Sequence, residues 1–121
     1  MLLKGKIALI TGSNRGVGLS MLKKFSENGA EVIACARSKN VEFEKIIFDI
    51  SEKYKNKITP VYFDLTDENE ITKGIEKIET ISNKVEIIVN NAGVNQVSLF
   101  QMTSIKKIKE VFDINFFSHI K

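Results

Sequence analysis

The chain has 121 residues, of which 43% are apolar, and its 18 basic and 15 acidic side chains leave a net charge of +3. This length is enough for one compact core and too short for two domains. The basic residues are spread from Lys4 to Lys121 without a basic run interleaved with aromatic residues, which argues against a nucleic-acid-binding surface.

Short apolar runs alternate with longer segments of helical periodicity, a pattern typical of βα units repeated around a parallel sheet. Strands are predicted at residues 6–11, 31–36, 58–63 and 85–89, each nearly continuous in apolar side chains. Such continuity is expected where helices cover both faces of the sheet. We therefore predict an α/β fold with a doubly wound parallel sheet of about four strands. The strand at 85–89 would then have an open apolar edge, which invites pairing with another chain.

Helical spacing predicts four helices between and after these strands. The first opens in the glycine-rich segment 12–18 and ends at Asn28-Gly29, a natural stop. The third is capped by Thr66 or Asp67, and a fourth begins near residue 103. The apolar positions that define these helices are, in order, Val17, Met21 and Phe25; Phe43, Ile46, Ile47 and Ile50; Ile71, Ile75 and Ile78; and Ile105, Ile108 and Phe112.

The single cysteine, Cys35, excludes an internal disulfide and fits a reducing cytoplasm. Its place in the apolar run 32–36 predicts a core residue and not a reactive thiol. The apolar stretch at 7–10 is too short for a signal peptide, and no stretch is long enough to cross a membrane. We expect a cytoplasmic protein with no membrane partner. His119 has no cysteine or histidine partner for a metal, so no metal site is predicted.

Three glycines lie between the first predicted strand and the first predicted helix. Because Gly12, Gly16 and Gly18 lack side chains, the backbone there can turn sharply and approach a pyrophosphate. The backbone amides at the start of the helix would then face the anion. This segment predicts a phosphate-binding loop of a dinucleotide site.

The end of the second predicted strand indicates which dinucleotide is preferred. An acidic side chain there would pair with the ribose hydroxyls of NAD, but this chain has Ala36-Arg37-Ser38. No carboxylate at this strand end would repel a 2′-phosphate, and the planar guanidinium of Arg37 suits one. Arg15 adds a second cation in the glycine loop. NADP is therefore predicted over NAD, although Arg37 could instead be a solvated residue at the end of a strand.

These residues resemble the short-chain dehydrogenase/reductase family, over essentially the whole chain. The segment 11–18 has that family's glycine spacing, and Asn90-Asn91-Ala92-Gly93 follows a fourth strand as it does there. Asp64-Leu65-Thr66 follows the third strand, where the family places an acid against adenine. Within the family, the opening segment 6–16 is most similar to the bacterial β-ketoacyl (3-oxoacyl) carrier-protein reductases of fatty-acid synthesis.

The resemblance implies a Rossmann-type fold and a role for each matched residue. Arg37 would meet the 2′-phosphate, Thr11 and Asn90 would tie the glycine loop to the central strands, and Asn115 would belong to the catalytic proton relay. The residues implied to bind the cofactor are Gly12, Ser13, Asn14, Arg15, Gly16, Val17, Gly18, Arg37, Asp64, Leu65, Asn91, Ala92 and Gly93.

The family's catalytic acid is a tyrosine with a lysine four residues later, and these 121 residues contain no such pair. Tyr54 is followed at that distance by Ile58, and Tyr62 by Thr66. We therefore expect the chain to be the cofactor-binding domain of an NADP-dependent carbonyl reductase, truncated at its C-terminus and inactive alone. The full-length protein would act on a small-molecule or carrier-protein-bound carbonyl and would form a homo-oligomer.

Two other functions remain open from the sequence. The chain could bind NADP without turning it over. It could instead dock on a partner through the open strand edge or through the Phe116-Phe117 pair.

Overall fold

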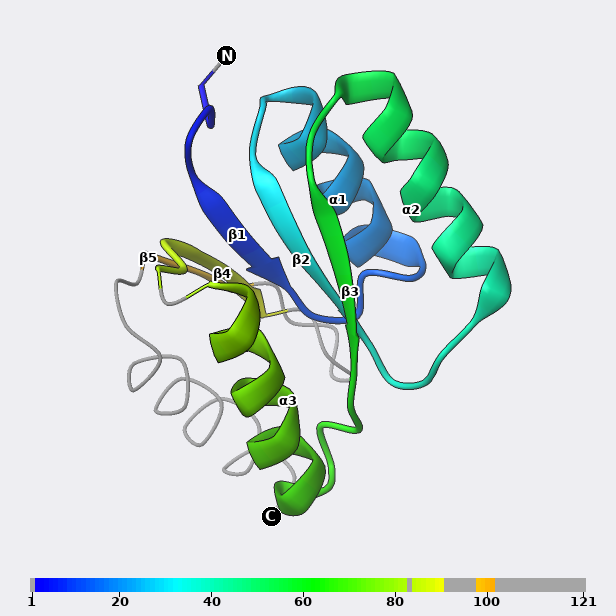
Figure 1. Ribbon diagram of the computed structural model, residues 1–121, viewed down its shortest axis with the longest axis vertical. Coiled ribbons are helices and arrows are strands. Elements are labelled where there is room, and N and C mark those ends of the chain that lie inside the picture. Colours follow the sequence, from blue (N-terminus) through cyan, green and yellow to red (C-terminus); the bar gives the residue numbers. More distant parts are fainter. Residues whose placement is uncertain (1, 83, 91–97, 102–121) are drawn as a thin grey trace.

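The structure is a computed structural model that describes residues 2–82, 84–90 and 98–101 (Figure 1). The strands are β1 (Ile7–Ile10), β2 (Glu31–Ala36), β3 (Ile58–Tyr62), β4 (Ile87–Asn90) and β5 (Ser98–Gln101), and the helices are α1 (Gly16–Glu27), α2 (Val41–Tyr54) and α3 (Glu68–Ile81).

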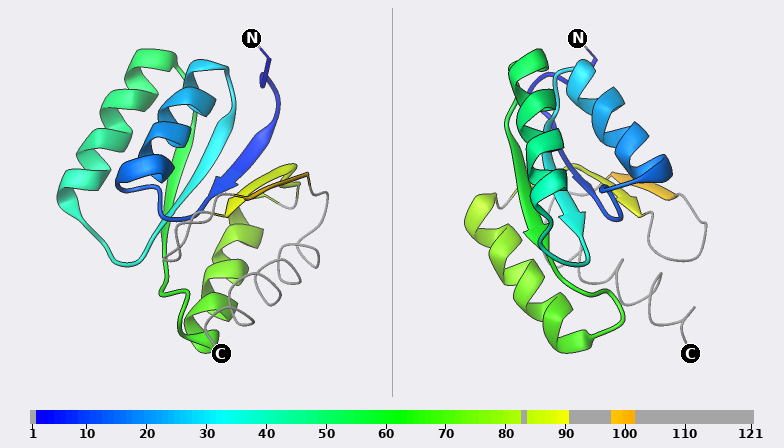
Figure 2. Two further views of the ribbon diagram at one scale, coloured as in Figure 1. Left: turned by 180° about the vertical axis from the view of Figure 1, so that it is seen from behind. Right: turned by 90° about the vertical axis from the view of Figure 1, so that its right-hand side faces the viewer.

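The strands form one sheet in the order β3-β2-β1-β4-β5. The first four are parallel, with Ala8 opposite Val32 on β2 and Ile87 on β4. Helices α1 and α2 cover one face and α3 covers the other (Figure 2). This is the predicted α/β, Rossmann-type doubly wound sheet.

Alternation along the central strands divides the core into two layers. On β1, Leu9 faces the α3 layer and Ile10 faces the layer of α1 and α2. On β2, Ile33 and Cys35 belong to the α3 layer, whereas Val32 and Ala34 belong to the other. All of these side chains are at most 2% exposed, so both faces of the central strands are covered, as the continuous apolar runs predicted.

The edge of the sheet differs from the prediction. The antiparallel β5 pairs with β4, with Ile88 opposite Phe100 and Val89 opposite Leu99. The sheet therefore has five strands and not four, and the predicted open edge of β4 is wrong among the described residues. The first, third and fourth strands also shift by one or two residues at their ends, where hydrogen bonding and apolar pattern often disagree.

The helices agree with the prediction in extent but not all in orientation. The faces predicted for α2 and α3 are turned inward, and Asp67 is the cap of α3. On α1, Val17 is 53% exposed, so this member of the predicted series is wrong, whereas Met21 and Phe25 are half-buried and pack on the core layer of α1 and α2. The buried positions of α1 are Gly18, Leu22 and Ser26, which lie one residue further along. The predicted fourth helix lies outside the described residues.

Candidate cofactor-binding site

The predicted site residues follow strands that end at the same edge of the sheet. Because β1 to β4 are parallel, the segments after all four leave at the carboxyl edge (Figure 1). The strand order also reverses there, with β2 on one side of β1 and β4 on the other. In open α/β sheets, ligands bind at the carboxyl edge beside such a reversal.

The segment from the end of β1 to the first residue of α1 contains two glycines in the left-handed conformation. The φ angles of Gly12 and Gly16 are 58° and 59°, a region that residues with a side chain rarely adopt. A Cβ atom on Gly16 would meet no described protein atom within 4 Å. The backbone at Gly16 is therefore open on the side where a side chain would stand.

Hydrogen bonds fasten this loop to the two strands that flank β1. The backbone N–H of Thr11 donates to the carbonyl of Val89 at 3.0 Å, and its hydroxyl lies 3.5 Å from the same oxygen. Ser13 donates both its N–H, at 3.0 Å, and its hydroxyl, at 2.9 Å, to the carbonyl of Cys35. The tying role predicted for Thr11 is confirmed. The buried Ser13 has the same role, and its predicted cofactor contact stays a prediction.

The start of α1 differs from the start of the other two described helices. Asn40 caps α2 and Asp67 caps α3, each with a side-chain oxygen that accepts two backbone N–H groups. Arg15, at the N-cap of α1, makes no such bond, and the first turn of α1 holds no acidic residue. The first amides of α1 and the positive end of its dipole therefore have no side-chain cap to occupy them, and they suit an anion.

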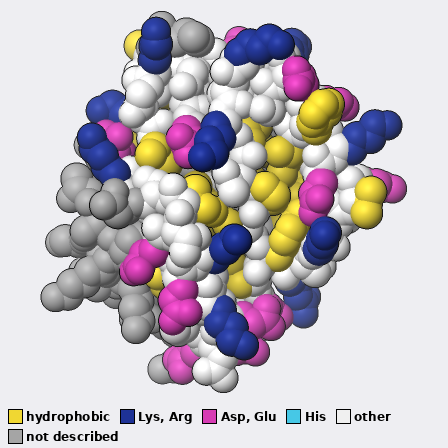
Figure 3. Space-filling model, in the orientation of Figure 1, with side chains coloured by type: hydrophobic (Ala, Val, Ile, Leu, Met, Phe, Trp, Pro, Cys, Tyr) yellow, Lys and Arg dark blue, Asp and Glu magenta, His cyan; other side chains and the backbone are white. Residues whose placement is uncertain are grey.

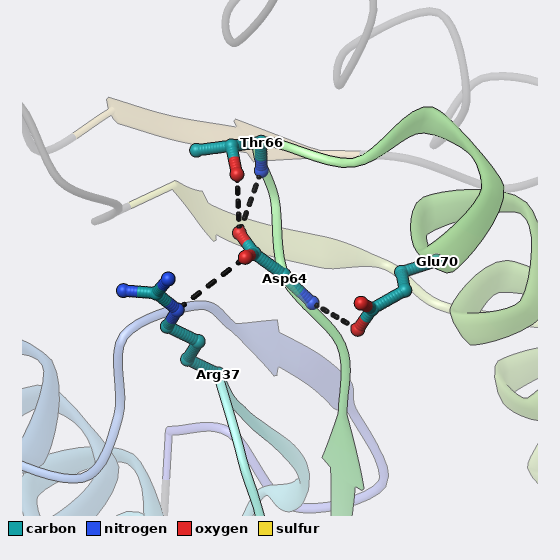
Figure 4. Close-up of polar contacts among 4 residues, drawn as sticks. All are labelled: Arg37, Asp64, Thr66 and Glu70. Atoms are coloured by element: carbon teal, nitrogen blue, oxygen red, sulfur yellow. Dashed lines mark hydrogen bonds and ion pairs between the residues drawn. The ribbon is translucent and has the colours of Figure 1, made fainter.

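The pairing of β2 with β3 brings together two residues that the sequence assigned to different parts of the cofactor. Ala36 lies opposite Tyr62, so Arg37 and Asp64 follow close behind the ends of neighbouring strands. The Nε atom of Arg37 lies 3.4 Å from Oδ2 of Asp64 (Figure 4). The end of β2 itself has no carboxylate, as predicted, but the fold supplies one from the segment after β3.

Two residues that the sequence did not predict as site residues hold Asp64 in place. The backbone N–H of Thr66 donates to Oδ1 of Asp64 at 2.9 Å, and the Thr66 hydroxyl donates to the same atom at 2.7 Å. The backbone N–H of Asp64 donates to Oε1 of Glu70 at 2.9 Å. The Asp-x-Thr pattern was the available signal, because an aspartate often accepts a bond from the residue two positions later. The bonds from Thr66, followed by the charge of Arg37, lower the pKa of Asp64.

The other predicted site residues are distributed as follows. Arg15 and Val17 are exposed, Asn14 is half-buried, and Gly18 is buried where α1 meets the sheet. Leu65 is half-buried and packs on the α3 layer of the core, so part of its surface is available at the carboxyl edge. The residues Asn91, Ala92, Gly93 and Asn115, and with them Phe116, Phe117 and His119, lie outside the described residues.

Two other kinds of feature are absent from the described residues. Groups of three or more potential metal ligands are absent from residues 2–82, 84–90 and 98–101, and no helix within these ranges could span a membrane. Cys35 is buried, and burial raises the pKa of its thiol, which confirms it as a core residue. Basic and acidic side chains are interspersed over the face seen in Figure 3.

A family model described as short chain dehydrogenase matches residues 6–121. The chain belongs to this family. It is 34% identical over 116 residues to the 3alpha-hydroxysteroid dehydrogenase of Mediterraneibacter gnavus, covering 95% of this chain and 46% of that protein. It is also 34% identical over 113 residues to the 3-oxoacyl-(acyl-carrier-protein) reductase FabG of Aquifex aeolicus, covering 93% and 45%. The predicted resemblance to that group of reductases is thereby confirmed.

The fold of this short chain dehydrogenase has a close match among solved structures. L-Sorbose reductase from Gluconobacter frateurii, complexed with NADPH and L-sorbose, gives a TM-score of 0.69 at 29% identity, covering 78% of this chain and 35% of that one. The chain thus spans less than half the length of these relatives.

Proposed function

We propose that this chain is the NADP(H)-binding domain of a short-chain oxidoreductase that reduces a carbonyl group. The observation that carries the proposal is the start of α1, which has no side-chain cap and no acidic residue, with one left-handed glycine in the preceding loop and another at its first position. The other two described helices have the reverse arrangement, with caps and acidic first turns. A pyrophosphate is the anion that such a loop accepts in dinucleotide-binding folds.

NADP is proposed over NAD because of Arg37. Its side chain is 81% exposed at the carboxyl edge, at the end of the strand beside which the adenosine ribose lies in this fold class. Arg15, also exposed, is at the N-cap of α1 in the same loop region. Two permanent positive charges at these positions suit the extra phosphate of NADP.

The residues proposed to hold the cofactor have separate tasks. The loop from Gly12 to Gly18 would bind the pyrophosphate with backbone amides, and Arg37 would bind the 2′-phosphate. Asp64 and Leu65 would border the adenine, and Asn91, Ala92 and Gly93 would lead toward the nicotinamide ribose. When bound, NADPH supplies the hydride for the carbonyl carbon. Asn115 is proposed to hold a water of the proton relay.

The described tyrosines do not supply the proton that the new alkoxide needs. Tyr62 donates its hydroxyl to Glu44 at 2.8 Å, and burial together with Glu44 raises the pKa of Tyr62 to about 12. Tyr54 is at the last position of α2, and its ring packs on the core layer of α1 and α2. We propose that these 121 residues alone bind the cofactor without reducing a substrate.

The substrate class is proposed from the relatives. A 3-oxoacyl group on a carrier protein is the first candidate, and a hydroxysteroid or sugar ketone is the alternative that the other relatives suggest. We also propose that these residues form one domain, that the protein is cytoplasmic, and that the full-length protein is a homo-oligomer. Docking through an open β4 edge loses its basis, because β5 pairs with β4.

Cofactor titration tests the proposal. NADPH and NADH are titrated into the purified protein and into Arg37→Met, with binding followed by nicotinamide fluorescence. We expect the wild type to prefer NADPH and Arg37→Met to lose that preference with little change for NADH. Methionine is a cleaner replacement than aspartate, which would add a second carboxylate beside Asp64. Equal losses for both cofactors would contradict the 2′-phosphate assignment, and no binding of either would contradict the dinucleotide site.

A further inference from the structure

The ion pair between Arg37 and Asp64 raises a question that the cofactor assignment leaves open. A carboxylate beside the arginine that binds a phosphate could repel the phosphate, or it could hold the arginine in place. The two roles predict opposite effects of removing the carboxylate. The geometry around Asp64 favours the second role.

Asp64 is held more firmly than Arg37. Two donors of Thr66 reach its Oδ1 at 2.9 and 2.7 Å, and its backbone N–H is bonded to Glu70 on the first turn of α3. The Asp64 side chain is 22% exposed, whereas that of Arg37 is 81% exposed. Asp64 is therefore the fixed member of the pair, and the long arginine side chain is the member whose freedom the contact restricts.

The contact also leaves the useful end of the arginine available. Asp64 meets Arg37 at Nε, with a separation of 3.4 Å (Figure 4). Among the described residues, no hydrogen bond or ion pair is found at the two terminal amino groups of the guanidinium. They are the atoms with which a guanidinium forms a paired contact to a phosphate. Meanwhile the charge of Asp64 is already shared among Thr66 and Arg37, which weakens its repulsion of a nearby anion.

We propose that Asp64, held by Thr66 and Glu70, is a positioning residue that sets the preference for a 2′-phosphate by fixing the Nε side of Arg37. This proposal rests on the proposed NADP site and assigns Asp64 a task beyond bordering adenine. Ordering the arginine before the ligand arrives removes part of the entropy cost of binding. Ligands without the 2′-phosphate gain nothing from this ordering.

The test compares two fragments of the cofactors. The probes are 2′,5′-ADP, which carries the 2′-phosphate, and ADP, which does not, each titrated into the purified protein by calorimetry. Asp64→Asn removes the charge of the positioning residue but keeps an oxygen that accepts from Thr66. The matched control is Asp67→Asn, which removes a charge three residues away and keeps the cap of α3, because asparagine caps as well as aspartate.

We expect Asp64→Asn to weaken binding of 2′,5′-ADP about two- to fivefold more than binding of ADP, the range set by an exposed charge pair. A lost contact with adenine would weaken both probes equally and does not enter this difference. The control should change neither probe by as much. In the Arg37→Met background, Asp64→Asn should have no further effect on 2′,5′-ADP, because the residue acts through Arg37. Thr66→Val, which removes one of the hydrogen bonds to Asp64, should also weaken binding of 2′,5′-ADP, but by less than Asp64→Asn.

Three results would overturn this proposal while leaving the proposed NADP site intact. Tighter binding of 2′,5′-ADP to Asp64→Asn than to the control would show that the carboxylate repels the phosphate. Equal weakening of both probes would show that Asp64 acts only on the part that they share, such as adenine. An additive effect in the Arg37→Met background would show that Asp64 does not act through the arginine. If Arg37→Met weakens binding of 2′,5′-ADP no more than binding of ADP, the proposed NADP site fails together with this inference.

Discussion

Replacing Gly16 with alanine separates the conformational role of this glycine from its role in binding. At a φ of 59° an alanine is strained, and a left-handed residue with a Cβ costs roughly 1–2 kcal/mol. No steric cost is added, because the new Cβ would meet no described protein atom within 4 Å. The free energy of unfolding should therefore fall by about 1–2 kcal/mol and no more.

Gly16→Ala should also weaken cofactor binding, because the pyrophosphate is proposed to lie in the open space beside Gly16. A methyl group there would push the phosphate away from the α1 amides. Losing hydrogen bonds to a charged group costs about 1.5–3 kcal/mol, which corresponds to about ten- to hundredfold weaker binding of NADPH.

Gly5 supplies the matched control for this experiment. Its φ is 81°, and a Cβ there would also meet nothing within 4 Å, but it precedes β1 at the opposite end from the glycine loop. Urea unfolding and NADPH titration are measured for Gly5→Ala and Gly16→Ala. Both should lose similar stability, and only Gly16→Ala should lose affinity. Wild-type affinity in Gly16→Ala, alongside the expected loss of stability, would refute the reasoning for the phosphate loop.

Three further predictions concern stability. In Gly74→Ala the new Cβ would stand 2.5 Å from the ring of Phe63. The overpacking cost of about 1–3 kcal/mol should exceed the helix-propensity gain of about 1 kcal/mol, so the urea midpoint should fall. Adding Phe63→Leu should recover part of the loss if the clash is its cause. Tyr62→Phe should reduce the fall in the free energy of unfolding between about pH 10 and pH 12. The raised pKa of about 12 means that the stability contributed by the Tyr62 hydroxyl is complete below about pH 10 and is lost toward pH 12. A variant that follows the wild type across this interval would contradict that assignment. Asp67→Ala should lower the free energy of unfolding by about 1 kcal/mol through loss of the α3 cap, and Asp67→Asn should not; equal losses in urea would show that charge and not capping matters.

The layered fold was predictable because the strand pattern depends on local sequence. In the run 31–36 every residue after Glu31 is apolar, as expected where both faces of a strand are covered, and β2 was predicted with its observed bounds. The orientation of α1 was not predictable in the same way. Val17, Met21 and Phe25 are regularly spaced, but Leu22 belongs to an overlapping series, and spacing alone does not say which series meets the sheet.

Two features depended on contacts between distant segments and escaped the sequence. The strand β5 is only four residues long, and its pairing with β4 is antiparallel, so neither its length nor the βα repeat indicated it. The contact of Arg37 with Asp64 requires the register in which Ala36 lies opposite Tyr62. Each residue was predicted as a site residue by its place after a strand. Their contact depends on the register between β2 and β3, which the sequence does not show.

The single thiol of the chain can report how often the glycine loop opens. Cys35 is buried in β2 with a raised pKa, so thiol reagents can modify it only when the strand is transiently exposed. The carbonyl of this same residue accepts both bonds from Ser13 in the loop. A ligand that stabilises the loop should therefore slow labelling of Cys35. The labelling rate of this natural cysteine therefore measures how often the site unfolds locally.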